Sequence, residues 1–114
     1  MSVKAPYVIR LADLAMQCVS REKGRALATE ILRIAGDNDI LLDLSDVEIL
    51  TTSFIDELVL RISEAGKLEH TTFRYTSEVA QERLERVTRF RPGIVLRLLG
   101  PDGERLVGSP TTHS

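Results

Sequence analysis

Apolar residues recur along this chain in two alternating patterns, short continuous runs and stripes at helical spacing. The short runs are rich in β-forming residues and predict strands at 7–11, 40–44, 71–75 and 94–99. The run at 40–44 is almost unbroken, which is typical of a strand buried on both faces. We therefore expect it to be a central strand.

The stripes predict three amphipathic helices, each of which begins near a serine that favours a helix N-terminus: Ser20, Ser53 and Ser77. The first helix should end at Gly36, the second should run from Phe54 to about Ala65, and the third should end before Pro92. The expected apolar faces consist of Leu27, Ile31 and Ile34; Phe54, Ile55, Leu58, Val59, Ile62 and Ala65; and Val79, Ala80, Leu84, Val87 and Phe90.

Alternation of strands and helices predicts an α/β fold, a small mixed sheet packed with about three helices. The turn at 100–103 and the segment 104–107 predict a C-terminal β-hairpin. Residues 12–19 give no clear pattern. The length of 114 residues fits one domain, over 1–107, and the small polar residues at 108–114 predict a flexible tail.

Composition narrows the classes of partner and cofactor. The net charge is −2, whereas nucleic-acid binders are usually strongly basic, so we expect no nucleic-acid partner. The apolar runs are too short to span a membrane, and the first residues do not resemble a signal peptide, so we expect a cytoplasmic protein. One cysteine, Cys18, and two histidines, His70 and His113, predict neither a metal site nor a cofactor.

The most informative segment is 41–65, where a buried strand and a short extended stretch lead to three hydroxyl residues at a helix start. Ser and Thr are preferred helix caps whatever the function, so capping is one interpretation of Thr51-Thr52-Ser53. Phosphorylation is the other, because the positive end of a helix dipole tolerates a phosphate. We expect Asp56 and Glu57 in the first helical turn, and Leu60 outside the apolar stripe.

Here the chain resembles a known family. The stretch Leu42-Asp43-Leu44 to Ser53-Phe54 is similar to the signature of STAS domains, the fold of bacterial anti-sigma-factor antagonists. Ser53-Phe54-Ile55-Asp56-Glu57 and the earlier Ser20-Arg21 resemble, more closely still, the STAS-like family of unknown function. The resemblance covers roughly residues 20–90. Thr51 stands where the switch proteins have aspartate, and Phe54 where they have glycine.

The resemblance implies a non-catalytic, protein-binding signalling module whose partner is a histidine-kinase-type ATPase or an anti-sigma-like kinase. It implies phosphorylation at the start of the second helix, with Ser53 and Thr52 as candidate acceptors. Partner-binding candidates are Thr51, Asp46, Asp56, Glu57 and Leu60. Two alternatives stay open, a scaffold domain without a phospho-switch and a small-ligand or nucleotide sensor. The sequence favours no oligomeric state.

Two further groups of charged residues bear on function. The acidic residues near the hydroxyl triplet do not form a catalytic pair, since adjacent Asp56 and Glu57 diverge by about 100° on a helix and cannot clamp one ion. No phosphate-binding glycine loop is present, so we expect no enzyme. The basic cluster Arg83–Arg91 is either an anion-binding surface or, as we favour, a solvated face with Glu82–Arg86 and Glu85–Arg89 ion pairs.

Overall fold

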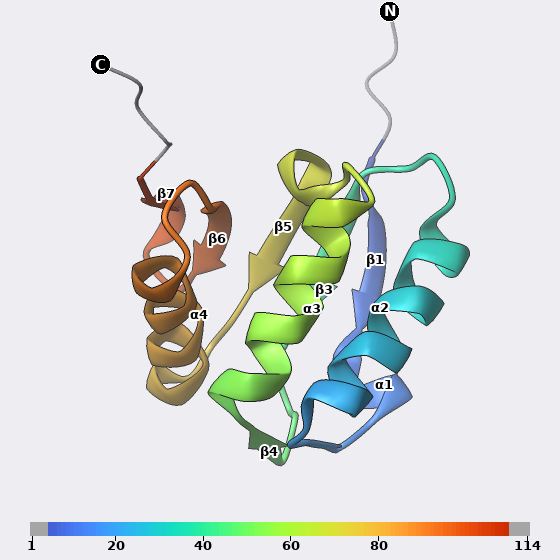
Figure 1. The fold of residues 1–114 in the computed structure, drawn as a ribbon, viewed down its shortest axis with the longest axis horizontal. Helices are drawn as coiled ribbons and strands as arrows, with labels where there is room; N and C mark the ends of the chain where they lie inside the picture. Colours follow the sequence, from blue (N-terminus) through green and yellow to red (C-terminus); the bar gives the residue numbers. More distant parts are fainter. Residues whose placement is uncertain (1–4, 110–114) are drawn as a thin grey trace, which may run out of the picture.

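The computed structural model describes residues 5–109, which form a five-stranded mixed sheet with helices on one face (Figure 1). The strand order is β1-β3-β5-β6-β7. Four strands run parallel, and the last pairs antiparallel with its neighbour to form the predicted C-terminal hairpin. Their bounds are β1 (Tyr7–Arg10), β3 (Ile40–Asp43), β5 (Thr71–Arg74), β6 (Val95–Gly100) and β7 (Gly103–Gly108).

Three helices connect the parallel strands, α2 (Arg21–Ala35), α3 (Thr52–Glu64) and α4 (Glu78–Phe90). They lie side by side on the same face of the sheet, with α3 between the other two (Figure 1). This placement follows from the strand order, because right-handed crossovers that all proceed in one direction leave every helix on one face. Short elements complete the described chain: α1 (Leu11–Leu14), η1 (Leu68–His70) and a parallel pair, β2 (Gln17–Cys18) with β4 (Ile49–Leu50).

The strand register separates the two faces of the sheet. Ile9, Leu42, Phe73 and Leu98 lie opposite one another in adjacent strands, and all four are buried beneath the helices. The alternate row faces away from the helices and includes two exposed apolar residues at the sheet edges. In order across the sheet, this row is Val8, Leu41, Thr72, Arg97 and Leu106.

Helices α2 and α3 approach each other closely at Gly24. A Cβ atom at this position would lie 2.7 Å from the backbone oxygen of Phe54 and 3.1 Å from the Cβ of Glu57. Glycine therefore allows the first turns of the two helices to touch. The contact fixes the start of α3, and with it the hydroxyl triplet, against α2.

The predicted fold class is confirmed, including the interior position of the strand at 40–44 and the hairpin. Ser20 and Ser77 cap their helices as expected, by accepting hydrogen bonds from the backbone N–H of Lys23 and Ala80. The segment 12–19, which the sequence left undefined, contains β2 and most of α1, which begins at Leu11, the last residue of the predicted first strand.

Four expectations about burial and boundaries were wrong. Ala65 does not belong to the apolar face of α3, because it lies at the end of the helix and is exposed. Val79 and Phe90 do not belong to the apolar face of α4, because they lie in its first and last turns and are exposed. Gly108, predicted to begin the tail, is the last residue of β7. The rest of the predicted tail, from residue 110, lies outside the described residues.

Candidate functional site

The three hydroxyl residues at the start of α3 have different environments. Thr51 is the N-cap, and its side-chain oxygen accepts a hydrogen bond of 3.2 Å from the backbone N–H of Phe54. Its backbone N–H also donates to the carbonyl oxygen of Cys18, which ties the cap to β2. Thr52 is the first helical residue and half-buried, whereas Ser53 is exposed.

This arrangement corrects the predicted start of the second helix. The helix begins at Thr52 rather than Phe54, so Ser53 is a helical residue and does not cap. Asp56 and Glu57 consequently lie beyond the first turn, and the first turn itself contains no acidic residue. The prediction that placed them in the first turn is therefore wrong, and both carboxylates lie beyond the reach of the helix dipole, whose effect falls off within one turn.

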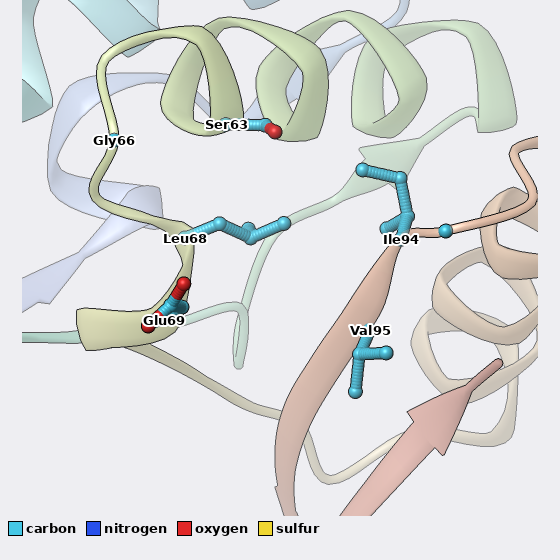
Figure 2. A pocket seen from close by; sticks show the side chains of 7 residues that line it. Ser63, Gly66, Leu68, Glu69, Ile94 and Val95 are labelled. Atoms are coloured by element: carbon cyan, nitrogen blue, oxygen red, sulfur yellow. The ribbon is translucent and has the colours of Figure 1, made fainter. Parts of the chain in front are cut away.

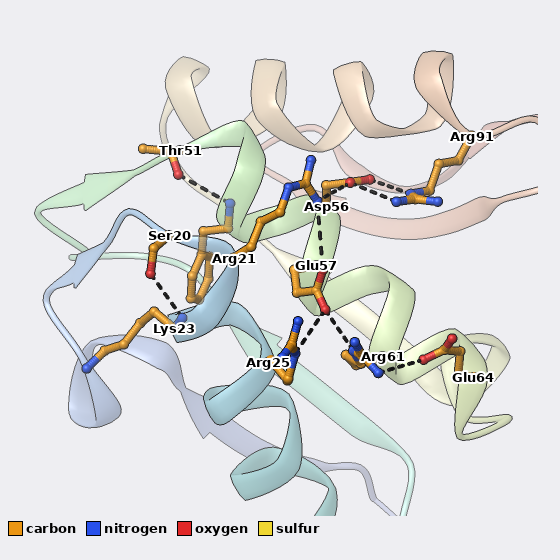
Figure 3. Close-up of polar contacts among 11 residues, drawn as sticks. Ser20, Arg21, Lys23, Arg25, Thr51, Asp56, Glu57, Arg61, Glu64 and Arg91 are labelled. Carbon is orange, nitrogen blue, oxygen red and sulfur yellow. Dashed lines mark hydrogen bonds and ion pairs between the residues drawn. The ribbon is translucent and has the colours of Figure 1, made fainter.

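Asp56 instead joins all three helices through ion pairs (Figure 3). Its side chain is only 8 % exposed, and Arg21 from the first turn of α2 approaches it to 2.6 Å. Arg91, immediately after α4, donates from Nε and from a terminal nitrogen, the latter at 2.9 Å. The hydrogen bonds from Arg91, reinforced by those from Arg21, hold the pKa of Asp56 below its ordinary value despite burial.

Glu57 makes a second set of ion pairs on the neighbouring side of α3. Arg61, one turn later, donates at 2.7 Å, and Arg25 of α2 lies 3.5 Å away. The hydrogen bond from Arg61 is the main reason that the pKa of Glu57 is lowered. Arg21 also approaches Glu57 to 3.8 Å, so one guanidinium lies between the two adjacent carboxylates. The 100° divergence on the helix therefore does not prevent them from sharing one cation.

These contacts bear on the partner-binding role predicted for Asp56 and Glu57. Both were expected to face a partner, but both are buried in contacts with this chain's own arginines. The cause is the central place of α3, which is covered on two sides by helices as well as by the sheet (Figure 1). Leu60, expected outside the apolar stripe, is half-buried and does not belong to the hydrophobic core.

Asp46 is exposed and lies in the loop before β4, where it adopts a positive φ of 67°. Its carboxylate pairs with Arg10 at 2.9 Å, at the end of β1. Asp46 and the hydroxyl triplet therefore lie at the same end of the sheet, where the parallel strands β1 and β3 finish.

Exposed apolar side chains near the hydroxyl triplet were missed by sequence reasoning. Met16, Val19 and Ile49 are all more than 40 % exposed and belong to, or directly flank, the β2–β4 pair. Backbone hydrogen bonds join this pair to Thr51, since Ile49 donates to Met16 and Thr51 donates to Cys18. The sequence at 16–19 has no regular alternation of apolar and polar residues, and a strand of two residues is too short for such a pattern to identify it.

The basic cluster Arg83–Arg91 is largely engaged within the chain. Glu82 pairs with Arg86 as predicted, but Glu85 pairs with Arg105 of β7, at 2.8 Å, where an Arg89 pair was expected. Arg83 donates to the backbone oxygen of Leu50, which connects α4 to the β4 strand before the hydroxyl triplet.

The surface is hollowed at both ends of the sheet. A hollow of about 270 Å³ lies at the amino ends of β5 and β6, between η1 and β6, and is lined by Leu68, Glu69 and Val95 (Figure 2). At the opposite end, a hollow of about 240 Å³ is lined by Val47, Glu48 and Leu50 together with the start of α4. The second hollow adjoins the segment that leads to the hydroxyl triplet.

Within residues 5–109, no group of three or more His, Cys, Asp or Glu side chains is placed to hold a metal ion. The described helices include none with the length and apolar character needed to cross a membrane. Comparison with protein-family models, with curated proteins and with solved structures found no match to this chain.

Proposed function

We propose that this protein is a non-catalytic, cytoplasmic interaction module that binds a histidine-kinase-type ATPase partner and is switched by phosphorylation of Ser53. The resemblance of the segment around Ser53 to STAS acceptor loops supports the proposal. The α/β architecture, with that segment at the start of a helix, is compatible with it.

The observation that carries the proposal is the separation of roles within the hydroxyl triplet. Thr51 makes the capping hydrogen bond, so Ser53 is not needed to satisfy the end of the helix. Ser53 is also the exposed member of the three, whereas Thr52 is half-buried. A kinase requires an accessible hydroxyl, so Ser53 is the favoured acceptor.

The surroundings of the helix start indicate how a phosphate would act. Met16, Val19 and Ile49, which belong to or directly flank the strand pair joined to Thr51, have exposed apolar side chains that supply contact area for a protein partner. A phosphate adds about −1.5 to −2 charges at neutral pH. At this helix end the fold itself tolerates that charge, so the effect falls on partner binding rather than on folding.

The test uses the ATPase-type kinase encoded nearest to this gene, incubated with the protein and ATP. Intact-mass measurement should find one phosphate on the parent protein and on the control Ser109→Ala, which removes another exposed serine. Ser53→Ala should take up none, and Thr52→Ala should behave as the parent. Phosphate on Ser53→Ala, or none on the parent, contradicts the assignment of the acceptor.

Binding of the same kinase by the variants tests the switch separately. Ser53→Asp should weaken binding by at least tenfold relative to Ser53→Ala, because aspartate introduces a negative charge at the same position. Equal binding of parent, Ser53→Ala, Ser53→Asp and Thr52→Asp, with no phosphate on either residue, would establish the scaffold alternative instead.

A further inference from the structure

Strand β7 forms one edge of the sheet, and its outer side is unpaired within residues 5–109 (Figure 1). Five of its six residues are exposed. Leu106 is 65 % exposed, on the sheet face that no described helix covers. An unpaired edge strand offers a row of backbone donors and acceptors to another strand, which makes it a site for pairing between chains.

The hairpin geometry determines which backbone groups face outward. A two-residue turn joins Gly100 to Gly103, and such turns are closed by a hydrogen-bonded pair. Hydrogen-bonded and non-hydrogen-bonded pairs alternate along an antiparallel ladder. The backbone groups of Arg105 and Val107 therefore face β6, and those of Glu104, Leu106 and Gly108 face outward.

The sequence of β7 is suited to pairing with itself in one register. An antiparallel pair with its two-fold axis at Leu106 places Leu106 opposite its own copy, Arg105 opposite Val107, and Glu104 opposite Gly108. Registers centred on Glu104 or Arg105 place like charges directly opposite each other, which is unfavourable. Only the register at Leu106 pairs the exposed apolar residues and opposes no like charges.

The charges on β7 do not prevent this contact, because each is already paired within its own chain. Glu104 accepts a hydrogen bond of 3.0 Å from Arg97, and Arg105 pairs with Glu85 at 2.8 Å. Edge strands that avoid association commonly carry unpaired charges or proline. β7 has no proline, and both of its charged residues are neutralised.

We propose that two copies of this protein associate through β7, antiparallel and about a two-fold axis at Leu106, to form a continuous ten-stranded sheet. The shared segment is short, so the dimer should be weak and dependent on concentration. The pairing leaves the hydroxyl triplet free, since that segment lies at the start of α3 and not at the β7 edge. The inference is therefore independent of the proposed function.

Sedimentation equilibrium from micromolar to millimolar concentration provides the first test. The parent should pass from monomer to dimer, and Leu106→Lys should weaken association by at least tenfold. The matched control is Val8→Lys, which changes an exposed apolar residue on the same sheet face at the opposite edge, and it should dimerise as the parent. A parent that stays monomeric at millimolar concentration, or a Leu106→Lys variant that associates as the parent, overturns the proposal.

Cysteine pairing tests the register in a background where the buried Cys18 is replaced by alanine. Directly opposite residues in an antiparallel hydrogen-bonded pair have Cα atoms about 5.5 Å apart, within the range of a disulfide. Leu106→Cys should therefore form a covalent dimer under mild oxidation, whereas Glu104→Cys should not, because it faces Gly108. Equal or preferential cross-linking of Glu104→Cys contradicts the register, and cross-linking by neither variant contradicts β7 pairing.

Discussion

At the scale of single residues, Thr51 and Ser53 have different environments although they are two positions apart and chemically alike. The side-chain oxygen of Thr51 accepts a hydrogen bond from the N–H of Phe54, and its backbone N–H donates to the carbonyl oxygen of Cys18 in β2. Sequence preference alone predicted a cap within the triplet but not its position, because all three residues satisfy the preference. Which of the three residues caps the helix depends on Cys18, which is 33 positions from Thr51 in the chain. The β2–β4 pair brings the two residues together.

This difference predicts unequal losses of stability for two similar substitutions. Thr51→Ala should lower the free energy of unfolding by about 1 kcal/mol, because it removes the side-chain acceptor for the N–H of Phe54. Ser53→Ala should change it by less than about 0.5 kcal/mol, since Ser53 is exposed and does not cap. Urea unfolding of both variants beside the parent measures the two values. An equal loss in the two variants would show that Ser53 also has a structural role.

At the scale of elements, α3 is the helix whose environment the sequence described least well. Five of the six residues predicted for its apolar stripe are buried, Phe54, Ile55, Leu58, Val59 and Ile62, whereas Ala65, at the end of the helix, is exposed. The burial of Asp56 and Glu57 was not, because a helical wheel places residues around an axis without showing what lies on each side. The arginines that surround Asp56 come from positions 35 residues before and after it, and no local pattern marks such pairs.

The ion pairs of Asp56 predict a specific dependence of stability on pH. The pKa of Asp56 is lowered in the folded protein, chiefly by Arg91, so the folded state binds a proton less readily than the unfolded state. The stabilisation is present above the unfolded pKa, near about 4, and is lost as the pH falls through the lower folded pKa. Between neutral pH and pH about 3, the parent should lose more stability than Asp56→Asn, which cannot titrate at this position.

Denaturant unfolding at a series of pH values measures this difference. Asp102→Asn is the control for the loss of one carboxylate, because Asp102 is exposed in the turn between β6 and β7. If Asp56→Asn loses stability with acid as steeply as the parent and the control do, the arginine contacts of Asp56 do not contribute to folding.

At the scale of the whole molecule, the order of the longer strands and helices was predictable from the sequence, and the short elements at one end of the sheet were not. Strands that alternate with helices require parallel pairing and crossovers, and the turn at 100–103 required a hairpin. Elements of two to four residues, α1, β2 and β4, are too short for periodicity to detect. They form the β2–β4 end of the molecule beside the hydroxyl triplet, so sequence reasoning located that triplet without its exposed apolar neighbours.

The layered architecture predicts an order of local stability that hydrogen exchange can measure. Strands β3 and β5 are each paired on both sides and have residues buried beneath α3, for example Leu42 and Phe73. Their amides should therefore exchange only through large-scale unfolding, and most slowly in the molecule. In β7, the amides of Arg105 and Val107 face β6 but lie in an exposed edge strand, so they should exchange faster than those of Leu42 and Phe73. Adding denaturant below the unfolding midpoint should accelerate the slowest amides most, because their exchange exposes the most surface. Equal protection in β3 and β7 would mean that the hairpin opens only with the rest of the sheet, and the edge would then be as stable as the interior.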